Sequence, residues 1–255
     1  MKHLMWAVII CLIPMLGTSQ DTDYQLFELF YFTPESGHGA DLTEAMSAHN
    51  KKYHPRGDYS AQVYSVMNGP NAGKYVWSMG PTTWTKIESR PADKGHDQDW
   101  DENVGIHIES YDATDFFKLN AEMSYFPGPT DLKVLNVWLV DLKDDQSYRY
   151  KQMMKKVTAV YKENEYEMPF GIYDRQLAGS HGIDVAMIWF VDGLEFFDTQ
   201  GPFAKDFDEM YGEGSMENLM DEWTSIVDRM DVEVWRFDAD MSGHDGTAVT
   251  RTGQD

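Results

Sequence analysis

The sequence predicts an α+β protein made of two copies of one β-α-β-β-α-β unit whose sheets face each other. The first observation is an internal repeat: a strand-like run at 26–32 is answered by a similar run at 134–140, and later runs match at similar offsets in the same order. The second observation is that both runs are apolar on both faces, so each sheet needs two covers. Helices can cover one face, and we expect the sheet of the sister unit to cover the other.

The chain is expected to divide into four segments. Residues 1–19 are expected to be a secretory signal peptide, because a basic start is followed by an apolar run at 4–16 that is too short to span a bilayer comfortably; an uncleaved anchor is the alternative. The first unit is assigned to 20–127 and the second to 128–241, with a Pro- and Gly-rich joint. Residues 242–255 are expected to be a disordered tail. These features predict an exported protein, periplasmic or extracellular.

Each element of the first unit has its own local signal. The opening strand is followed by a capping-box pattern that starts a helix with an apolar stripe. Two strand-like runs then flank a Gly- and Asn-rich turn, as in a hairpin. Asp99 is expected to cap a second helix, whose apolar stripe includes His107. The expected elements are, in order, 26–32, 41–53, 59–67, 74–79, a helix from about 99, and 121–126.

The second unit repeats this order with clearer periodicity. Its second helix carries a continuous apolar stripe, which is the strongest helical signal of the chain. Two units of this order follow the ferredoxin-like plan. The expected elements are a strand at 134–140, a helix around 150–160, hairpin strands at 171–178 and 184–191, a helix at 216–230, and a strand at 231–237.

Composition excludes several classes of function. The formal net charge is −22, with 43 acidic against 21 basic residues, and such a field repels nucleic acids and anionic membrane surfaces. Cys11, the only cysteine, lies in the expected signal peptide, so thiol catalysis and thiolate-bound metals are not expected in the mature chain. No phosphate-binding loop, nucleophile elbow or His-Glu-x-x-His motif occurs. We expect a small-molecule partner and a monomer or weak homo-oligomer.

The element order resembles the dimeric α+β barrel superfamily over most of residues 24–240. This superfamily includes antibiotic-biosynthesis-type monooxygenases, NIPSNAP-like domains and, in fused form, chlorite dismutase-like haem proteins. The resemblance implies a single-chain pseudo-dimeric α+β barrel with helices outside. It also implies that a ligand would lie between the two sheets, or between a sheet and its helices.

Strand alternation predicts the residues of such a site. The aliphatic residues Leu135, Val137 and Leu139 are expected to face helices, which puts Asn136 and its counterpart Glu28 inside the barrel. A buried carboxylate or amide is costly unless paired, so both are candidates for a base or hydrogen-bonding anchor. The alternative is that they pair with each other or with an arginine across the barrel. The aromatic residues expected to line the same space as ligand contacts are Phe30, Trp77 and Trp138.

Histidine offers a second candidate chemistry. His107 and His49 each fall on an apolar helical stripe, where either could ligate haem iron. In the resembling haem-degrading monooxygenases an Asn of the first strand lies over the haem, and Asn136 resembles it. The chain has few basic residues to hold haem propionates, so no cofactor is expected, with haem the less favoured option. No metal ligands are assigned, and each histidine can also be read as a satisfied core residue.

Three functions remain open from the sequence. The first is binding of a small, largely apolar or aromatic molecule between the sheets. The second is a cofactor-free or haem-dependent monooxygenase that uses Glu28, Asn136 and His107. The third is a structural or interaction protein with a fully packed barrel. A cavity of a few hundred Å³ inside the barrel would favour binding over the packed alternative.

Overall fold

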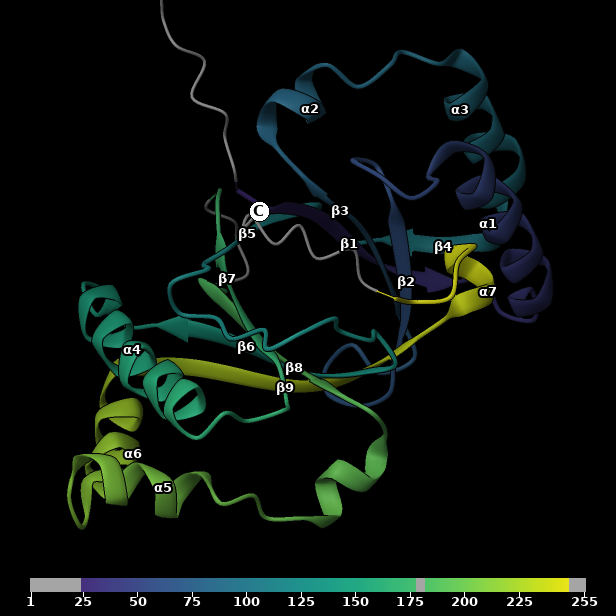
Figure 1. Cartoon of the computed structure of the whole chain (residues 1–255). Helices are drawn as coiled ribbons and strands as arrows, with labels where there is room; N and C mark the ends of the chain where they lie inside the picture. The colour runs from purple at the N-terminus through teal and green to yellow at the C-terminus, as the bar shows by residue number, and fades with distance from the viewer. Residues whose placement is uncertain (1–23, 178–181, 248–255) are drawn as a thin grey trace, which may run out of the picture.

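The computed structural model describes residues 24–177 and 182–247 (Figure 1). The expected signal peptide, 1–19, and the end of the expected tail, 248–255, lie outside the described residues. The elements of unit one are β1 (Leu26–Pro34), α1 (Gly39–Tyr53), β2 (Ala61–Val66), β3 (Tyr75–Thr82), α2 (Trp84–Glu88), α3 (Lys94–Asp99), the π-helical η1 (Trp100–Val104), the 3-10 turn η2 (Gly105–His107), β4 (Ile108–Tyr111) and β5 (Asp115–Leu119).

Unit two repeats the plan with one strand fewer among the described residues. Its elements are β6 (Val134–Leu142), α4 (Ser147–Glu163), β7 (Phe170–Arg175), β8 (Val185–Val191), the 3-10 turn η3 (Leu194–Asp198), α5 (Phe203–Tyr211), α6 (Ser215–Ile226), β9 (Val227–Phe237) and α7 (Ala239–Ser242).

Eight antiparallel strands close into one barrel. Their order is β1-β3-β2-β9-β6-β8-β7-β5, and β5 pairs back onto β1. Two seams join the units, since β2 pairs with β9 and β5 pairs with β7. Helices α1–α3 lie outside the unit-one half of the barrel and α4–α6 outside the unit-two half, whereas the short α7 packs beside α1 of unit one (Figure 1). The predicted pseudo-dimeric barrel is therefore confirmed, with β4 as an added strand that pairs with the end of β1.

The strand register confirms that the two opening strands are equivalent. Glu28 lies opposite Met79 on β3, and Asn136 lies opposite Trp189 on β8. Two residues further along, Phe30 lies opposite Trp77, and Trp138 lies opposite Met187. Glu28 and Asn136 thus occupy matching positions, as the repeat predicts.

The predicted direction of these two side chains is wrong. The barrel interior is lined by the other face of each strand, which contributes Leu29, Tyr31 and Leu139 to the central core. Phe30 packs instead into the core under α1, and Trp138 packs into the core under α4 and α6. Both faces of these strands are apolar, so hydrophobicity alone does not distinguish the barrel face from the helix face.

Three further expectations about unit one are also corrected. The last strand is Asp115–Leu119, whereas 121–126 forms a turn with one bridge from Tyr125 to Phe170. The helical segment ends at His107, and the strand β4 follows directly. Asp99 does not cap a helix start, because Asp93 does so by accepting a hydrogen bond from the backbone N–H of Gly95 at 2.8 Å.

Residues 242–247, expected to begin a disordered tail, pack on unit one instead. Asn50 of α1 donates a hydrogen bond to the carbonyl of Met241, and the hydroxyl of Ser242 accepts one from the backbone of Val63, both at 2.8 Å. His244 then bonds the Ala61 carbonyl at 2.8 Å, and Thr247 bridges to Asp131. The closing segment therefore ties unit two to unit one.

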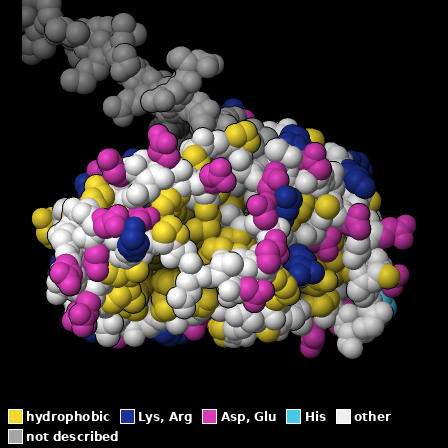
Figure 2. Space-filling model, turned by 60° about the horizontal axis from the view of Figure 1, so that its bottom comes forward, with side chains coloured by type: hydrophobic (Ala, Val, Ile, Leu, Met, Phe, Trp, Pro, Cys, Tyr) yellow, Lys and Arg dark blue, Asp and Glu magenta, His cyan; other side chains and the backbone are white. Residues whose placement is uncertain are grey.

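The surface agrees with the acidic composition. Figure 2 shows more acidic than basic side chains on the visible face, with apolar side chains exposed in the hollows between them. Among the described residues, no helix is both long and apolar enough to cross a membrane.

Candidate functional site

Cavities lie in three layers of the described structure, and two of these layers are equivalent in the two units. One of about 330 Å³ lies inside the barrel, between the two sheets. A cleft of about 630 Å³ lies between the sheet and helices of unit one, and a smaller one of about 200 Å³ lies in the corresponding layer of unit two. We refer to them as the barrel cavity, the unit-one cleft and the unit-two cleft.

The barrel cavity is mostly apolar and carries two unpaired phenol groups. Tyr64 of β2 and Tyr173 of β7 come from different units and line it together. Burial raises the pKa of each well above the usual value, and neither hydroxyl is hydrogen-bonded to another described residue. The apolar lining includes Phe27, Leu29, Phe117, Leu135, Leu139, Ala186, Ile188 and Trp235. The cavity can therefore offer two hydrogen-bonding groups within an apolar wall.

A buried carboxylate does lie in the central core, but it is Glu233 on β9. Its side chain is fully buried and accepts hydrogen bonds from Tyr31 at 3.0 Å, Asn71 at 2.8 Å and the indole of Trp235 at 2.7 Å. Burial, followed by the Glu233 charge, raises the pKa of Tyr31 well above its usual value. Three donors satisfy this carboxylate, so it acts as a fixed anchor between β1, β9 and the 68–73 turn.

The unit-one cleft contains three of the six predicted site residues. Glu28 accepts a hydrogen bond from Arg90 at 2.5 Å, and Phe30 stacks on Trp77 with ring centroids 5.3 Å apart. The alternative prediction that an arginine pairs with Glu28 is therefore correct. The arginine, however, comes from the segment after α2 and not from across the barrel. Trp100 closes the aromatic wall at 6.1 Å from Phe30.

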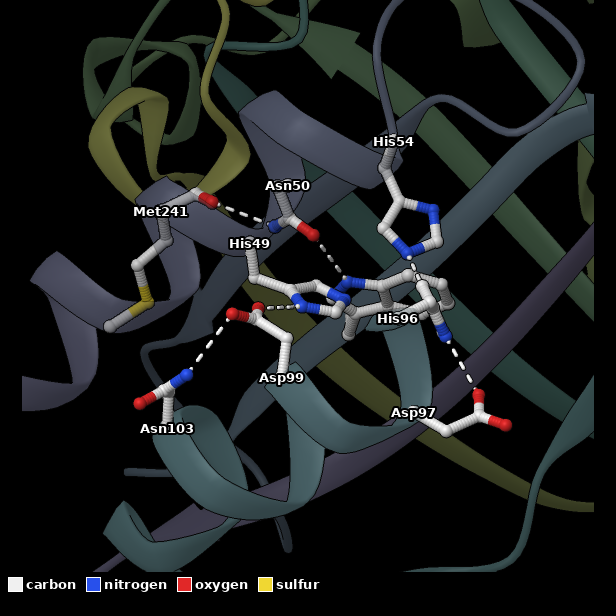
Figure 3. Close-up of polar contacts among 9 residues, drawn as sticks. His49, Asn50, His54, His96, Asp97, Asp99, Asn103 and Met241 are labelled. Atoms are coloured by element: carbon white, nitrogen blue, oxygen red, sulfur yellow. Dashed lines mark hydrogen bonds and ion pairs between the residues drawn. The ribbon is translucent and has the colours of Figure 1, made fainter. Parts of the chain in front are cut away.

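Three histidines meet at one side of this cleft (Figure 3). His49 lies on α1, His54 directly follows that helix, and His96 lies on α3. Burial lowers the pKa of His54 to about 3, against a hydrogen bond to the Tyr59 carbonyl that raises it. Burial also lowers the pKa of His49, against an opposing hydrogen bond to Asp99. These two imidazoles are therefore neutral at physiological pH.

The unit-two cleft has no comparable polar groups among its lining residues. Trp138 lies 4.9 Å from Trp189 and 6.3 Å from Trp223, measured between ring centroids. Methionines fill most of the remaining wall, from α4, β8 and α6. Asn136 follows the same strand face as Trp138, is 7% exposed, and its side-chain oxygen has no hydrogen-bond partner.

The structure therefore separates the predicted site. Glu28, Phe30 and Trp77 lie together in unit one, whereas Asn136 and Trp138 lie in unit two. His107 belongs to neither group: it stacks on His38 with centroids 5.6 Å apart, and its Nδ1 is buried without a partner. Their catalytic roles stay predictions, since no observation tests them.

Sequence reasoning did not find the histidine cluster or the phenol pair. His49 and His54 are five positions apart on one helix and its end, but His96 is distant in the chain, so no local motif joins the three. Tyr64 and Tyr173 lie on strands of different units. For the histidine cluster, the sequence signal is the unusual number of histidines and acidic residues between 93 and 107.

Haem does not fit the residues of these cavities. The barrel cavity and the unit-two cleft have no histidine among the residues that line them. The unit-one cleft has histidines, but the aspartates at 97, 101 and 112 also line it and would repel the two propionates. Its one lining arginine, Arg90, is already paired with Glu28.

Comparison with known proteins supports the fold and nothing finer. No protein-family model matches the chain, and no curated protein matches it in sequence. A candidate monooxygenase from Lactobacillus acidophilus NCFM gives a TM-score of 0.54 at 13% identity, covering 84% of this chain and 94% of that one. Chlorite dismutase from Candidatus Nitrospira defluvii gives 0.52 at 10% identity, covering 87% and 94%.

An anthrone oxidase-like protein is similar to the same extent. It gives a TM-score of 0.50 at 13% identity, covering 85% of this chain and 92% of that one. Identities this low carry fold and not activity. Because the matches span both units and the eight strands close on themselves, the chain has the dimeric α+β barrel fold, with both halves of the barrel in a single polypeptide.

Proposed function

We propose that the chain binds a small, largely apolar or aromatic molecule inside its barrel, between the two units. The observation that carries this proposal is the pair of phenol hydroxyls of Tyr64 and Tyr173, which line a cavity of about 330 Å³ without a protein partner. Cavities of roughly 300–1,000 Å³ with an apolar wall and a few polar groups are typical small-molecule sites.

The cavity also argues against the packed-barrel alternative. Protein interiors are close-packed, and voids much larger than one water molecule are few. A fully packed barrel would leave no hollow of about 330 Å³ between its sheets. The hydroxyls of Tyr64 and Tyr173 open onto this cavity, where a ligand can form hydrogen bonds with them. The preferred ligand is therefore an aromatic molecule with one or two oxygen acceptors, such as a phenol, quinone or aryl ketone.

Binding can be tested with a neutral naphthylamine dye, which fluoresces in apolar surroundings, and with aryl ketones as competitors. Ala186 lines the barrel cavity, so Ala186→Phe should fill it and abolish dye binding. Tyr64→Phe should leave dye binding intact but weaken ketone competition about fivefold to tenfold, because one hydrogen bond of about 1 kcal/mol is lost.

A matched control separates the barrel from the helix layer. Val157 lines the unit-two cleft, and Val157→Phe should leave dye affinity unchanged. Loss of binding in Val157→Phe with retention in Ala186→Phe would assign the dye to the unit-two cleft and refute the proposal. Circular dichroism of each variant checks that the barrel is folded.

A further inference from the structure

The three histidines of the unit-one cleft have their ring nitrogens arranged as metal ligands. One nitrogen from each of His49, His54 and His96 lies within 4.8 Å of the other two. The Nε2 atoms of His54 and His96 are 3.2 Å apart. Two nitrogens bound at 2.0–2.1 Å to a tetrahedral ion lie about 3.3 Å apart, so this spacing suits a shared ion.

Each imidazole is oriented through its other nitrogen. His49 Nδ1 bonds Asp99 at 2.7 Å, His54 Nδ1 bonds the Tyr59 carbonyl at 2.9 Å, and His96 Nδ1 bonds Asp97 at 2.9 Å (Figure 3). A carbonyl or carboxylate oxygen can only accept a hydrogen bond, so each Nδ1 carries the proton and is the donor. Metal-binding histidines usually donate their other ring N–H to a carboxylate or carbonyl oxygen in this way.

The consequence is that three lone pairs remain on the Nε2 atoms. With Nδ1 protonated, a neutral ring has its acceptor at Nε2. In this tautomer the Nε2 atoms of His54 and His96, which lie 3.2 Å apart, are both acceptors, and His49 Nε2 is buried with no hydrogen-bond partner. A cation shared by the three nitrogens satisfies all of them at once.

We infer that His49, His54 and His96 bind one Zn²⁺-class divalent ion through their Nε2 atoms. Imidazole is a preferred ligand of zinc and of neighbouring transition metals, and three protein ligands leave a fourth position open. His54 and His96 also line the unit-one cleft, so that position is accessible from a space of about 630 Å³ walled by Phe30, Trp77 and Trp100. The site is separate from the barrel cavity and does not depend on the proposed function.

The test uses the full chain without a polyhistidine tag, stripped by chelation and titrated with Co²⁺ and then Zn²⁺. We expect one Co²⁺ per chain, the intense visible absorption of tetrahedral Co²⁺, and its displacement by Zn²⁺. Tryptophan emission should be quenched, because the rings of Trp100 and Trp77 lie 5.1 Å from His49 and 5.0 Å from His54. His96→Gln should weaken binding more than about 100-fold, and Asp99→Asn about 10–100-fold.

The chain offers a matched control in a second, more exposed group, which consists of His38, Asp41 and His107. His107→Gln should leave the stoichiometry, absorption and quenching unchanged. The inference is overturned if no Co²⁺ binds, if His96→Gln binds as tightly as the parent, or if His107→Gln abolishes binding. His96 is only partly buried on the short α3, and a thermal melt of the metal-free variant checks that it folds.

Discussion

The two helix–sheet clefts occupy equivalent places in the two units but have opposite chemistry. The unit-one cleft is lined by histidines, aspartates and an ion pair between Glu28 and Arg90. The unit-two cleft is lined by methionines and tryptophans. At the offset that joins Glu28 to Asn136, His49 corresponds to Val157, and the strand register matches Trp77 with Met187.

This difference shows what the repeat conserves. Both units keep the strand order, the register and the helix that covers the sheet. Only the unit-one cleft is lined by histidines and charged side chains, and such groups are costly in this layer unless they are paired. An apolar cleft like that of unit two therefore completes the fold at a smaller cost in free energy. The polar groups of unit one then require a reason beyond folding, and ligand binding supplies one.

The largest expected contrast is between leucine substitutions at the matching positions 28 and 136. Glu28→Leu leaves the Arg90 charge without its carboxylate, and the Nε of Arg90 is already buried without a partner. We expect a loss of about 2 kcal/mol in the free energy of unfolding. Asn136→Leu removes an unpaired buried oxygen and should be neutral or stabilising by up to about 1 kcal/mol.

Urea unfolding at neutral pH measures both values. Glu28→Gln is the intermediate control, because it keeps an acceptor for Arg90 but removes the charge, and it should fall between the parent and Glu28→Leu. Equal effects at the two positions would mean that the clefts do not differ in the way their chemistry indicates.

A reciprocal exchange at positions 49 and 157 should give a smaller contrast. Val157→His places an imidazole in the unit-two cleft, where no lining residue is a carboxylate; because Val157 is only partly buried, the substitution should destabilise by about 1 kcal/mol. His49→Val removes a buried unpaired Nε2 but also the bond to Asp99. These two effects oppose each other, so the metal-free protein should change by less than about 1 kcal/mol.

The exchange is measured by urea unfolding in the presence of a chelator, with Val157→Leu as the size control. A stable Val157→His variant would show that the unit-two layer tolerates an imidazole, and the contrast between the clefts would lose its energetic basis.

The sequence was sufficient to predict the fold but not which face of each opening strand points into the barrel. The repeat predicts the element order and the equivalence of Glu28 with Asn136, because both depend on spacing along the chain. The choice of barrel face depends on what packs against each face. Leu135, Val137 and Leu139 belong to the core inside the barrel, and their aliphatic pattern suits a helix-covered face equally well.

The candidate sites required tertiary contacts that no local pattern contains. The histidine cluster joins one helix to a segment about 40 residues later, and the phenol pair joins strands of different units. Taken alone, each of these residues would be interpreted as an ordinary core or boundary side chain. These groups form only in the folded protein, where α3 lies beside α1 and β2 lies opposite β7 across the barrel.

The smallest contrast concerns Tyr150 of α4, which corresponds to Leu42 of α1 at the same offset. The Tyr150 hydroxyl is buried without a partner, and burial raises its pKa well above the usual value. In the unfolded chain a phenol loses its proton near pH 10. Above that pH the unfolded state binds fewer protons than the folded state, so the free energy of unfolding falls as pH rises, by up to about 1.4 kcal/mol per pH unit for this group.

Tyr150→Phe removes this contribution. At pH 7 the variant should match the parent or exceed it by up to about 1 kcal/mol, since an unpaired hydroxyl is lost. Above pH 10 its advantage should widen, and other buried phenols do not affect the difference because both proteins share them. Urea midpoints from pH 7 to 11 give the measurement, and Tyr148→Phe, which changes a residue 71% exposed on the same helix, is the control. If the difference between Tyr150→Phe and the parent stays constant across this range, the hydroxyl titrates alike in both states, and Tyr150 is not buried as deeply as its counterpart Leu42.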